Sequence, residues 1–219
     1  MDKDAGSGLI LGIESAIEGG SLCLFRGNTE ISCVCGKFGL SRAEDLIPTI
    51  QSLMVRSRVL PQELSVVVVS LGPGSFTGIK IGIATASGMA AGLRVRCLGV
   101  SILTAMATSS ENDGRIIAAV PVGRNSVCFQ RFDKSGRTIT AITSPTLATE
   151  SDFTDLFQQK GLTFVLHDQL QGRIDCLKAT EILITGPNLA KFLINAYIQE
   201  MCSEDLKPVF VDREPVALR

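Results

Sequence analysis

One stretch of the chain, Val66–Leu93, limits its fold more than any other. It opens with four consecutive valines that continue into Ser70 and Leu71, a run that predicts a strand buried on both faces. A glycine-rich loop, Gly72–Gly78, follows, and we expect a helix from about Thr77 to Leu93. A buried strand that leads through a short loop into a helix is typical of the α/β class.

The order of expected elements occurs twice. Apolar runs at 9–15, 21–25 and 31–35 predict three strands, and a second set falls at 116–122, 126–132 and near 138–143. The two sets start about 105 residues apart, which is a weak internal repeat. Helices and strands alternate after each set, so we expect two stacked α/β halves. The polar stretch Ser109–Gly114 places the boundary between lobes of residues 1–109 and 110–219.

Two expected helices are candidates for a contact surface. The helix over Arg42–Arg56 carries an apolar stripe, and the helix over Thr77–Leu93 has small residues four apart, where another helix can come close. The predicted interface residues are Leu46, Ile50, Leu53, Gly78, Gly82, Ala86 and Ala90. We expect them to mediate self-association or partner binding in a two-fold arrangement. The alternative is that the small residues pack against the chain's own sheet.

Composition argues against a free-standing RNA-binding module. The 219 residues carry a formal net charge of −1, with no Trp and one Tyr, whereas such modules usually show a basic surface or aromatic stacking platforms. If RNA is the ultimate substrate, we expect this chain to meet it only through other subunits. No apolar run approaches the roughly 20 residues of a membrane span, and the polar start shows no targeting segment, so we expect a cytoplasmic protein.

The cysteines indicate free thiols. There are seven of them, an odd number, and none forms a CxxC pair. Cys33 and Cys35 are two apart on an expected strand and therefore share one face. We expect reduced, mostly buried thiols, as in cytosolic proteins, with redox or adventitious metal chemistry as the alternative.

The glycine-rich loop is a candidate anion site. It lies between a buried strand and a helix N-terminus, where backbone N–H groups and the helix dipole favour a phosphate. The loop has neither the GxxxxGK[ST] spacing of a Walker A motif nor the GxGxxG spacing of a dinucleotide site. A phosphate site and a purely structural tight turn therefore both remain open. The candidate residues are Gly72, Gly74, Ser75, Thr77, Gly78 and Lys80.

Glu14 and Ser15 end the first expected strand and extend that candidate nucleotide site. An acidic residue at a strand end can hold Mg²⁺ or its waters beside a nucleotide, but an ordinary polar strand end is the simpler interpretation. His167 is the only histidine, so a two-histidine metal site is excluded, and no nucleophile motif accompanies it. We therefore expect no catalytic residue and no metal of the chain's own.

Four segments together resemble the TsaB (YeaZ) family. They are Ile10-Leu-Gly-Ile-Glu-Ser15, Asp45-Leu-Ile-Pro48, Gly72-Pro-Gly-Ser-Phe-Thr-Gly-Ile-Lys-Ile-Gly82 and Leu98-Gly-Val-Ser-Ile-Leu-Thr-Ala105. The GPGSFTG run is highly specific, and the order and spacing of the four segments agree with the family. The resemblance is strong over roughly residues 9–107 and weak afterwards.

The resemblance implies a fold and a role. The fold would be the actin-like, sugar-kinase-like duplicated ribonuclease-H-like fold with two lobes, the ASKHA fold. The role would be that of a bacterial, cytoplasmic, non-catalytic subunit that supports the catalytic paralogue TsaD, together with the ATPase TsaE, in forming N6-threonylcarbamoyladenosine in tRNA. The family also implies a homodimer through the N-terminal half. No cofactor of its own is expected, and ATP or ADP would bind at the interface of the complex.

The sequence departs from the family pattern at four positions. Glu14 replaces the usual Asp, Lys80 the usual Arg, Arg42 a common His, and Pro121-Val122 a common Asp-Ala. Lysine is a poorer bidentate clamp for an anion than arginine. These changes weaken a private nucleotide or metal chemistry and leave the apolar helix faces intact.

Two other functions stay open at this point. The same fold carries stand-alone ATPases and small-molecule kinases, which would use an acid on each side of the cleft; Glu14 is present, but its counterpart is Pro121. A metalloprotease would need metal ligands that a chain with one histidine does not supply.

Overall fold

The computed structural model describes residues 8–35, 43–174 and 181–211, and its first half is built on a five-stranded sheet with the strand order β3-β2-β1-β4-β5. The strands are β1 (Leu9–Glu14), β2 (Ser21–Arg26), β3 (Thr29–Cys35), β4 (Leu64–Ser70) and β5 (Arg96–Val100). The same half contains the helices α1 (Ala43–Arg56) and α2 (Phe76–Leu93) and the short 3-10 helix η1 (Pro61–Glu63).

The second half contains a six-stranded sheet. Its order is β11-β10-β6-β7-β8, with β9 also paired to β7. The strands are β6 (Gly114–Val122), β7 (Ser126–Ser135), β8 (Thr138–Ala141), β9 (Thr146–Thr149), β10 (Leu162–His167) and β11 (Ile182–Thr185). The helical elements that follow β5 are α3 (Ile102–Ala107), α4 (Glu150–Asp155), η2 (Leu156–Gln158), η3 (Asp168–Leu170) and α5 (Leu189–Ile198).

The two sheets share one topology. In each, three successive strands form an antiparallel meander, and two later strands add in parallel beside the first strand of that meander. The internal repeat in the sequence therefore corresponds to two copies of a ribonuclease-H-like sheet, and the expectation of a two-lobed ASKHA fold is confirmed.

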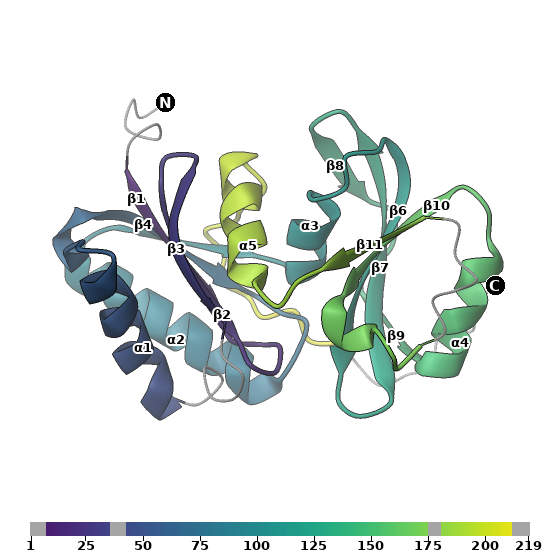
Figure 1. Cartoon of the computed structure of the whole chain (residues 1–219), viewed down its shortest axis with the longest axis horizontal. Helices are drawn as coiled ribbons and strands as arrows, with labels where there is room; N and C mark the ends of the chain where they lie inside the picture. The colour runs from purple at the N-terminus through teal and green to yellow at the C-terminus, as the bar shows by residue number, and fades with distance from the viewer. Residues whose placement is uncertain (1–7, 36–42, 175–180, 212–219) are drawn as a thin grey trace.

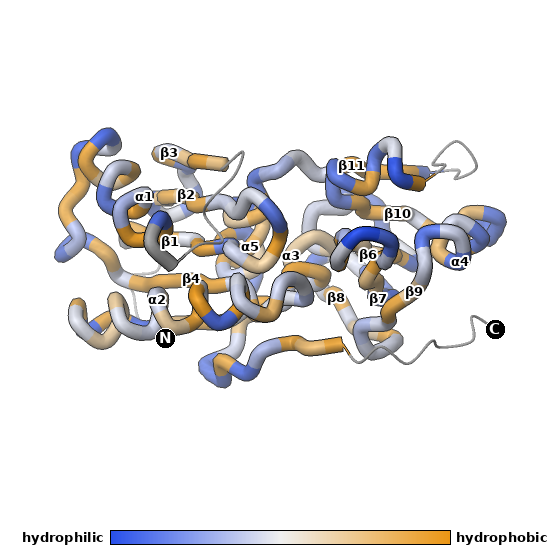
Figure 2. The backbone as a smooth tube through the Cα atoms, turned by 90° about the horizontal axis from the view of Figure 1, so that it is seen from below, coloured by the Kyte–Doolittle hydropathy of each residue, from blue (hydrophilic) through white to orange (hydrophobic). Residues whose placement is uncertain are grey.

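Helices and sheets alternate in five layers (Figure 1). Helices α1 and α2 cover the outer face of the first sheet, α5 and α3 lie between the two sheets, and α4 covers the far face of the second sheet. Figure 2 shows the same arrangement from below, with α5 and α3 between β1 and β6. Within the described ranges, no helix has both the length and the apolar character needed to cross a bilayer.

The valine run is buried on both faces, as its composition predicts. Because successive side chains of a strand point to opposite faces, Val67 and Val69 pack with α1 and α2 in the outer core. Val66 and Val68 point to the other face and pack in the central core, which lies between the two sheets and includes residues of α3 and α5. A strand that serves two cores needs apolar residues at every position, which explains the uninterrupted run.

Helix α5 connects the lobes. It follows β11 of the second sheet in the chain but packs on the first sheet, where its Leu189, Ala190 and Ile194 belong to the central core. A Cβ at Gly12 of β1 would lie 2.8 Å from the carbonyl oxygen of Ala190 and 2.9 Å from the Ile194 side chain. Glycine at position 12 therefore allows the helix to approach the sheet closely.

Some expected boundaries were wrong. The helix expected from Pro187 to about Cys202 is shorter, because α5 begins after Asn188 and ends at Ile198. The helix expected over Glu150–Gln159 ends at Asp155 and continues as the 3-10 helix η2. Strand β9 was missed. The expected capping box at Ser41 and the departure at Arg42 lie outside the described residues.

Candidate functional site

The carboxyl ends of β1 and β4 bring the predicted anion site together. These strands are parallel neighbours, so the turn after Glu14 and the loop after Ser70 leave the same edge of the sheet. The backbone N–H of Ser75 donates to the carbonyl oxygen of Ala16 at 2.7 Å, and the Ser15 hydroxyl donates to the carbonyl oxygen of Gly78 at 2.8 Å. The two predicted halves of the site are therefore in direct contact.

The glycines of the loop make this contact possible. A Cβ at Gly74 would collide with the backbone of Ala16, one at Gly78 with the backbone of Ser15, and one at Gly82 with the Ser15 hydroxyl. The space that the glycine side chains would otherwise fill is thus taken by the chain's own β1–β2 turn. This geometry favours the structural-turn interpretation of the GPGSFTG run.

Glu14 closes that turn. Its side chain is 1% exposed, and one carboxylate oxygen accepts the N–H groups of Ala16 at 2.6 Å and Ile17 at 2.9 Å. Burial raises the pKa of Glu14 from 4.5 to about 7, against the lowering effect of the two hydrogen bonds. A desolvated carboxyl that binds its own turn has little capacity left for a hydrated magnesium ion.

The amino end of α2 presents the remaining predicted residues. Ser75 is the N-cap and accepts the N–H of Gly78 at 3.3 Å. Ser75, Thr77 and Lys80 are exposed, and the Lys80 ammonium lies 3.9 Å from the ring centroid of Phe76. Lys80 thus makes a cation–π contact on the outer surface, in contrast to the buried Glu14.

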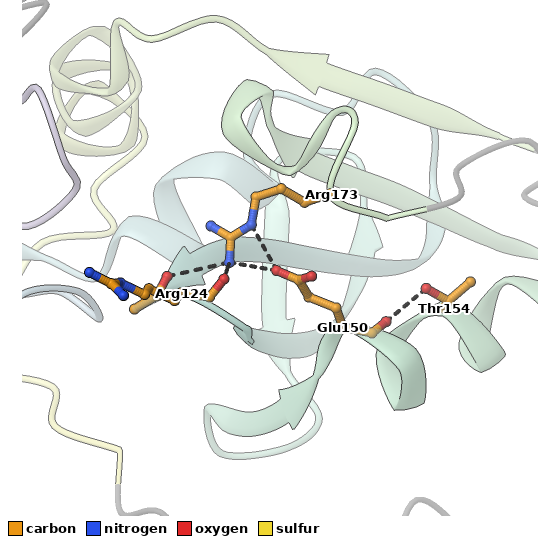
Figure 3. A network of polar contacts seen from close by, with 5 residues as sticks. Arg124, Glu150, Thr154 and Arg173 are labelled. Carbon is orange, nitrogen blue, oxygen red and sulfur yellow. Dashed lines mark hydrogen bonds and ion pairs between the residues drawn. The ribbon is translucent and has the colours of Figure 1, made fainter.

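The facing edge of the second lobe is held by a residue that sequence reasoning missed. Arg173 donates from Nε to Glu150 at 2.7 Å, and from Nη2 to the carbonyl oxygens of Arg124 at 2.7 Å and Gly123 at 3.3 Å (Figure 3). The guanidinium thereby fastens the β6–β7 turn, which follows Pro121. No motif marks Arg173, because its partners are two backbone carbonyls and a glutamate from separate segments.

His167 is a structural residue at the end of β10. It is 1% exposed, its Nδ1 accepts the N–H of Gln169 at 3.2 Å, and burial lowers its pKa, with Asp168 opposing the shift. Nδ1 also lies 3.2 Å from an Asp168 oxygen, which would be an ion pair only with a protonated ring. The acceptor role and the lowered pKa indicate the neutral ring instead. Gln169 donates to the carbonyl oxygen of Glu18 at 2.9 Å, a contact between the lobes.

The predicted interface residues lie on the wrong faces of their helices. Leu46, Ile50, Leu53, Ala86 and Ala90 are buried in the outer core, and Gly78 and Gly82 pack against the β1–β2 turn. The reason is that this face of the first sheet is apolar. The apolar side of α1 and the small-residue side of α2 both pack on it. The assignment of these seven residues to a partner surface is therefore wrong.

A different set of residues points outward. Ile47 and Val55 of α1 are 48% and 75% exposed. On α2 the exposed positions beyond the first turn are Lys80, Ala84, Gly88, Ala91 and Gly92. No charged residue occurs between Lys80 and Arg94. The two helices contact each other and lie side by side (Figure 1), so they offer one weakly polar outer surface, named here the α1/α2 face.

One cysteine pair departs from the expectation of free thiols. Cys23 of β2 and Cys33 of β3 are opposite each other in the register, and their sulfurs are bonded. Within the described ranges, Cys35, Cys97, Cys128 and Cys202 are free, and Cys176 lies outside those ranges. The expectation of reduced thiols is therefore wrong for Cys23 and Cys33. The same two sulfurs and the Glu30 carboxylate form the sole His/Cys/Asp/Glu group of metal-ligating size among the residues described.

Comparison with known proteins gives consistent matches. A family model described as "TsaD: tRNA N6-adenosine threonylcarbamoyltransferase" matches residues 41–205. The tRNA threonylcarbamoyladenosine biosynthesis protein TsaB of Escherichia coli is 30% identical over 131 residues, 57% of this chain and 55% of that protein. TsaB of Bacillus subtilis is 25% identical over 162 residues, 73% of this chain and 71% of that protein. The match thus spans little more than half of the E. coli relative.

Solved structures agree on the fold. YeaZ from Pseudomonas aeruginosa superposes with a TM-score of 0.67 and 17% identity, covering 93% of this chain and all of that one. An activator of 2-hydroxyisocaproyl-CoA dehydratase from Clostridium difficile, solved with bound ADPNP, gives a TM-score of 0.51 at 10% identity and covers 88% of this chain and 94% of that one. The family model covers most of the chain, so the chain belongs to the TsaD family and, within it, to the TsaB (YeaZ) group.

Proposed function

We propose that this chain is a non-catalytic partner subunit in the formation of tRNA N6-threonylcarbamoyladenosine. The observation that carries the proposal is the outward α1/α2 face, which is weakly polar and uncharged along most of α2. Exposed apolar residues occur singly on most proteins, but small and apolar residues exposed together on two neighbouring helices are typical of a site where another helix docks. A partner would cover Ile47 and Val55 and approach α2 closely over Ala84 and Gly88.

The partner we propose is a TsaD-like catalytic subunit. Relatives of the chain carry the name of a tRNA threonylcarbamoyladenosine biosynthesis protein, and the family model is named for the transferase itself. A TsaD-like chain of the same fold would bring corresponding helices to this face. A second copy of this chain carries the same helices, so a homodimer would use the same face. A TsaE-like ATPase would join the pair, and ATP or ADP would bind at the interface of the complex. We place the assembly in the cytoplasm.

The non-catalytic role is supported by the state of the candidate site. The β1–β2 turn packs directly against Gly74, Gly78 and Gly82. The Glu14 carboxylate accepts hydrogen bonds from the backbone of that turn and does not face outward. In the second lobe Pro121 stands where a stand-alone ATPase or kinase would carry its second acid. With a formal net charge of −1, the chain would meet tRNA through the complex and not alone.

The experiment is to place bulk on the α1/α2 face without touching the core. Ala84→Trp and Gly88→Leu would be compared with wild type for co-purification with a TsaD-like chain and for mass by light scattering. A Cβ at Gly88 meets no atom within 4 Å, so the fold should tolerate the change. We expect at least a tenfold loss of partner binding, because a wide side chain prevents close helix approach.

The matched control is Ser151→Trp, which adds the same side chain to the exposed face of α4 in the other lobe and should leave binding unchanged. Normal partner binding by folded Ala84→Trp and Gly88→Leu proteins would remove the α1/α2 face from the proposal. Separately, the isolated chain should hydrolyse ATP at background rate, and robust turnover abolished by Glu14→Ala would favour the stand-alone ATPase.

A further inference from the structure

The Cys23–Cys33 pair joins a buried strand to an edge strand. β3 is the outermost strand of the first sheet, and Cys23 and Cys33 face each other across the β2–β3 ladder with their Cα atoms 4.2 Å apart. Such closely spaced opposite residues are those whose side chains approach best in an antiparallel pair. Cys23 is fully buried, whereas Cys33 is half-buried, so reagents reach the pair from the Cys33 side.

The surroundings of the pair tie it to the first turn of α5. The Asn188 side-chain nitrogen lies 3.9 Å from the Cys23 sulfur, and Asn188 is the N-cap residue of α5. Glu30 of β3 forms an ion pair with Lys191 of α5 at 3.1 Å, and its carboxylate lies within 4.8 Å of both sulfurs. The pair thus sits where the edge strand meets the helix that connects the lobes.

The other described cysteines are poor competitors for this pairing. Burial raises the pKa of Cys128 and of Cys202 to about 12, and it raises the pKa of Cys97 as well. Cys35 is on the same strand and exposed, but burial and the negative charges of Asp168 and Glu30 raise its pKa too. Because the thiolate is the reactive form, these four remain thiols near neutral pH and leave the Cys23–Cys33 pairing unscrambled.

We propose that Cys23 and Cys33 form a reversible thiol–disulfide pair that fastens the edge strand β3 to the sheet. The chain keeps free thiols, including an exposed one, which is typical of proteins in reducing surroundings. The oxidant is a small organic disulfide: the Cys33 thiolate attacks one sulfur and releases a thiolate, and Cys23 then attacks the Cys33 sulfur and releases the second. Two protein thiols become one disulfide, and the reagent is reduced to two thiols.

The bond should stabilise the folded state. It closes a loop of sequence separation 10, which restricts the unfolded hairpin, and it holds an edge strand that otherwise has one neighbour. We therefore expect the oxidised protein to have a higher Tm than the reduced protein. The amide hydrogens of β3 should exchange more slowly in the oxidised form.

The test is a redox titration of the purified full chain. The protein is equilibrated with graded ratios of oxidised to reduced dithiothreitol, quenched with acid, alkylated, and mapped by mass spectrometry. We expect Cys23 and Cys33 to lose alkylation together, with the ratio of disulfide to dithiol protein rising tenfold for each tenfold rise in the reagent ratio. Cys97, Cys128 and Cys202 should stay fully alkylated. Oxidation should raise Tm in wild type and in Cys35→Ser, but not in Cys33→Ser.

Three results would overturn the proposal. The first is independent titration of Cys23 and Cys33, or a disulfide map that joins other residues. The second is an unchanged Tm after full oxidation of the wild-type pair, a measurement that does not depend on whether Cys33→Ser folds. The third is protection from alkylation that a chelator removes and a reductant does not, together with stoichiometric binding of Zn²⁺ alone. That result would assign the two sulfurs and Glu30 to a metal site.

Discussion

Single residues explain why the sequence left two interpretations of the glycine-rich loop open. The glycine-rich loop predicted either a phosphate site or a structural tight turn, and the strand-end position of Glu14 placed a carboxyl group beside it. Both features meet in the structure. The partner of the glycines is the backbone of Ser15 and Ala16, and sequence alone cannot distinguish an approaching phosphate from an approaching peptide group, because both require the absence of a Cβ.

Glu14 should make stability depend on pH in an unusual direction. Its folded pKa of about 7 lies above the ordinary 4.5, so the native state holds a proton that the unfolded state has lost. Stability is therefore highest below the unfolded pKa and falls as pH rises from about 4.5 to about 7. We expect Glu14→Gln, which keeps an acceptor oxygen for the turn, to remove this fall and to be more stable than wild type at pH 8 by up to about 3 kcal/mol.

Urea unfolding of both proteins at pH 5 and pH 8 measures the effect. Glu18→Gln is the control, because Glu18 is an exposed neighbour in the same turn, and its curve should follow wild type at both pH values. If wild type and Glu14→Gln differ by the same amount at pH 5 and pH 8, Glu14 does not titrate in this range.

Arg173 should contribute more to the free energy of unfolding than an exposed surface ion pair does. Its guanidinium joins Glu150 to two backbone carbonyls, and its side chain is 27% exposed. Arg173→Lys keeps the charge but cannot reproduce the fork of donors. We expect a loss of about 1–2 kcal/mol in denaturant unfolding. Lys207→Met, which breaks a pair whose lysine is 86% exposed, should have a much smaller effect on stability. Equal effects of the two changes would contradict the role of the fork.

Elements were easier to predict than their orientation. The expected strand, loop and helix between Val66 and Leu93 were found with boundaries close to the observed β4 and α2. Periodicity could not predict which side of α2 faces the sheet, because α2 is apolar or small on nearly every side. Small and apolar residues suit packing on the chain's own sheet and packing on a partner chain equally well. Only the structure shows that Ala86 faces the sheet and Ala84 faces outward.

Two glycines of α2 provide a direct test of this orientation. An added Cβ meets nothing at Gly88 but collides with the Ser15 hydroxyl at Gly82. Alanine favours a helix interior over glycine by about 0.8–1.0 kcal/mol, so Gly88→Ala should raise the free energy of unfolding by up to that amount. Gly82→Ala should lower it, because the collision moves the Ser15 hydroxyl away from its hydrogen bond to the carbonyl oxygen of Gly78. Thermal unfolding of the two variants measures both, and a shift of the same sign in each would mean that α2 is rotated from the orientation described.

At the scale of the whole molecule, the two lobes share one apolar core, which the sequence did not indicate. The repeat predicted two halves with a boundary near residue 109, and the second sheet does begin at Gly114. What the repeat could not predict is that α5 returns to the first sheet, because that packing depends on Gly12 of β1, about 180 residues away from α5. The central core consequently contains residues of both sheets, α3 and α5, and neither lobe has an independent inner face.

A shared core predicts that the two lobes unfold together. Removing either sheet would expose the apolar residues of α3 and α5, so a partly unfolded state with one intact lobe should be poorly populated. Tyr197, the only tyrosine, lies on α5, and its fluorescence should therefore change at the same urea concentration as the circular dichroism of the whole chain.

Ile194→Ala, which empties space against Gly12, should shift both transitions together and lower the free energy of unfolding by about 2–5 kcal/mol. Ile198→Ala is the matched control, because Ile198 is 36% exposed at the end of the same helix, and it should cost much less. Separate midpoints for the tyrosine signal and the circular dichroism would mean that the lobes are independent folding units despite their common core.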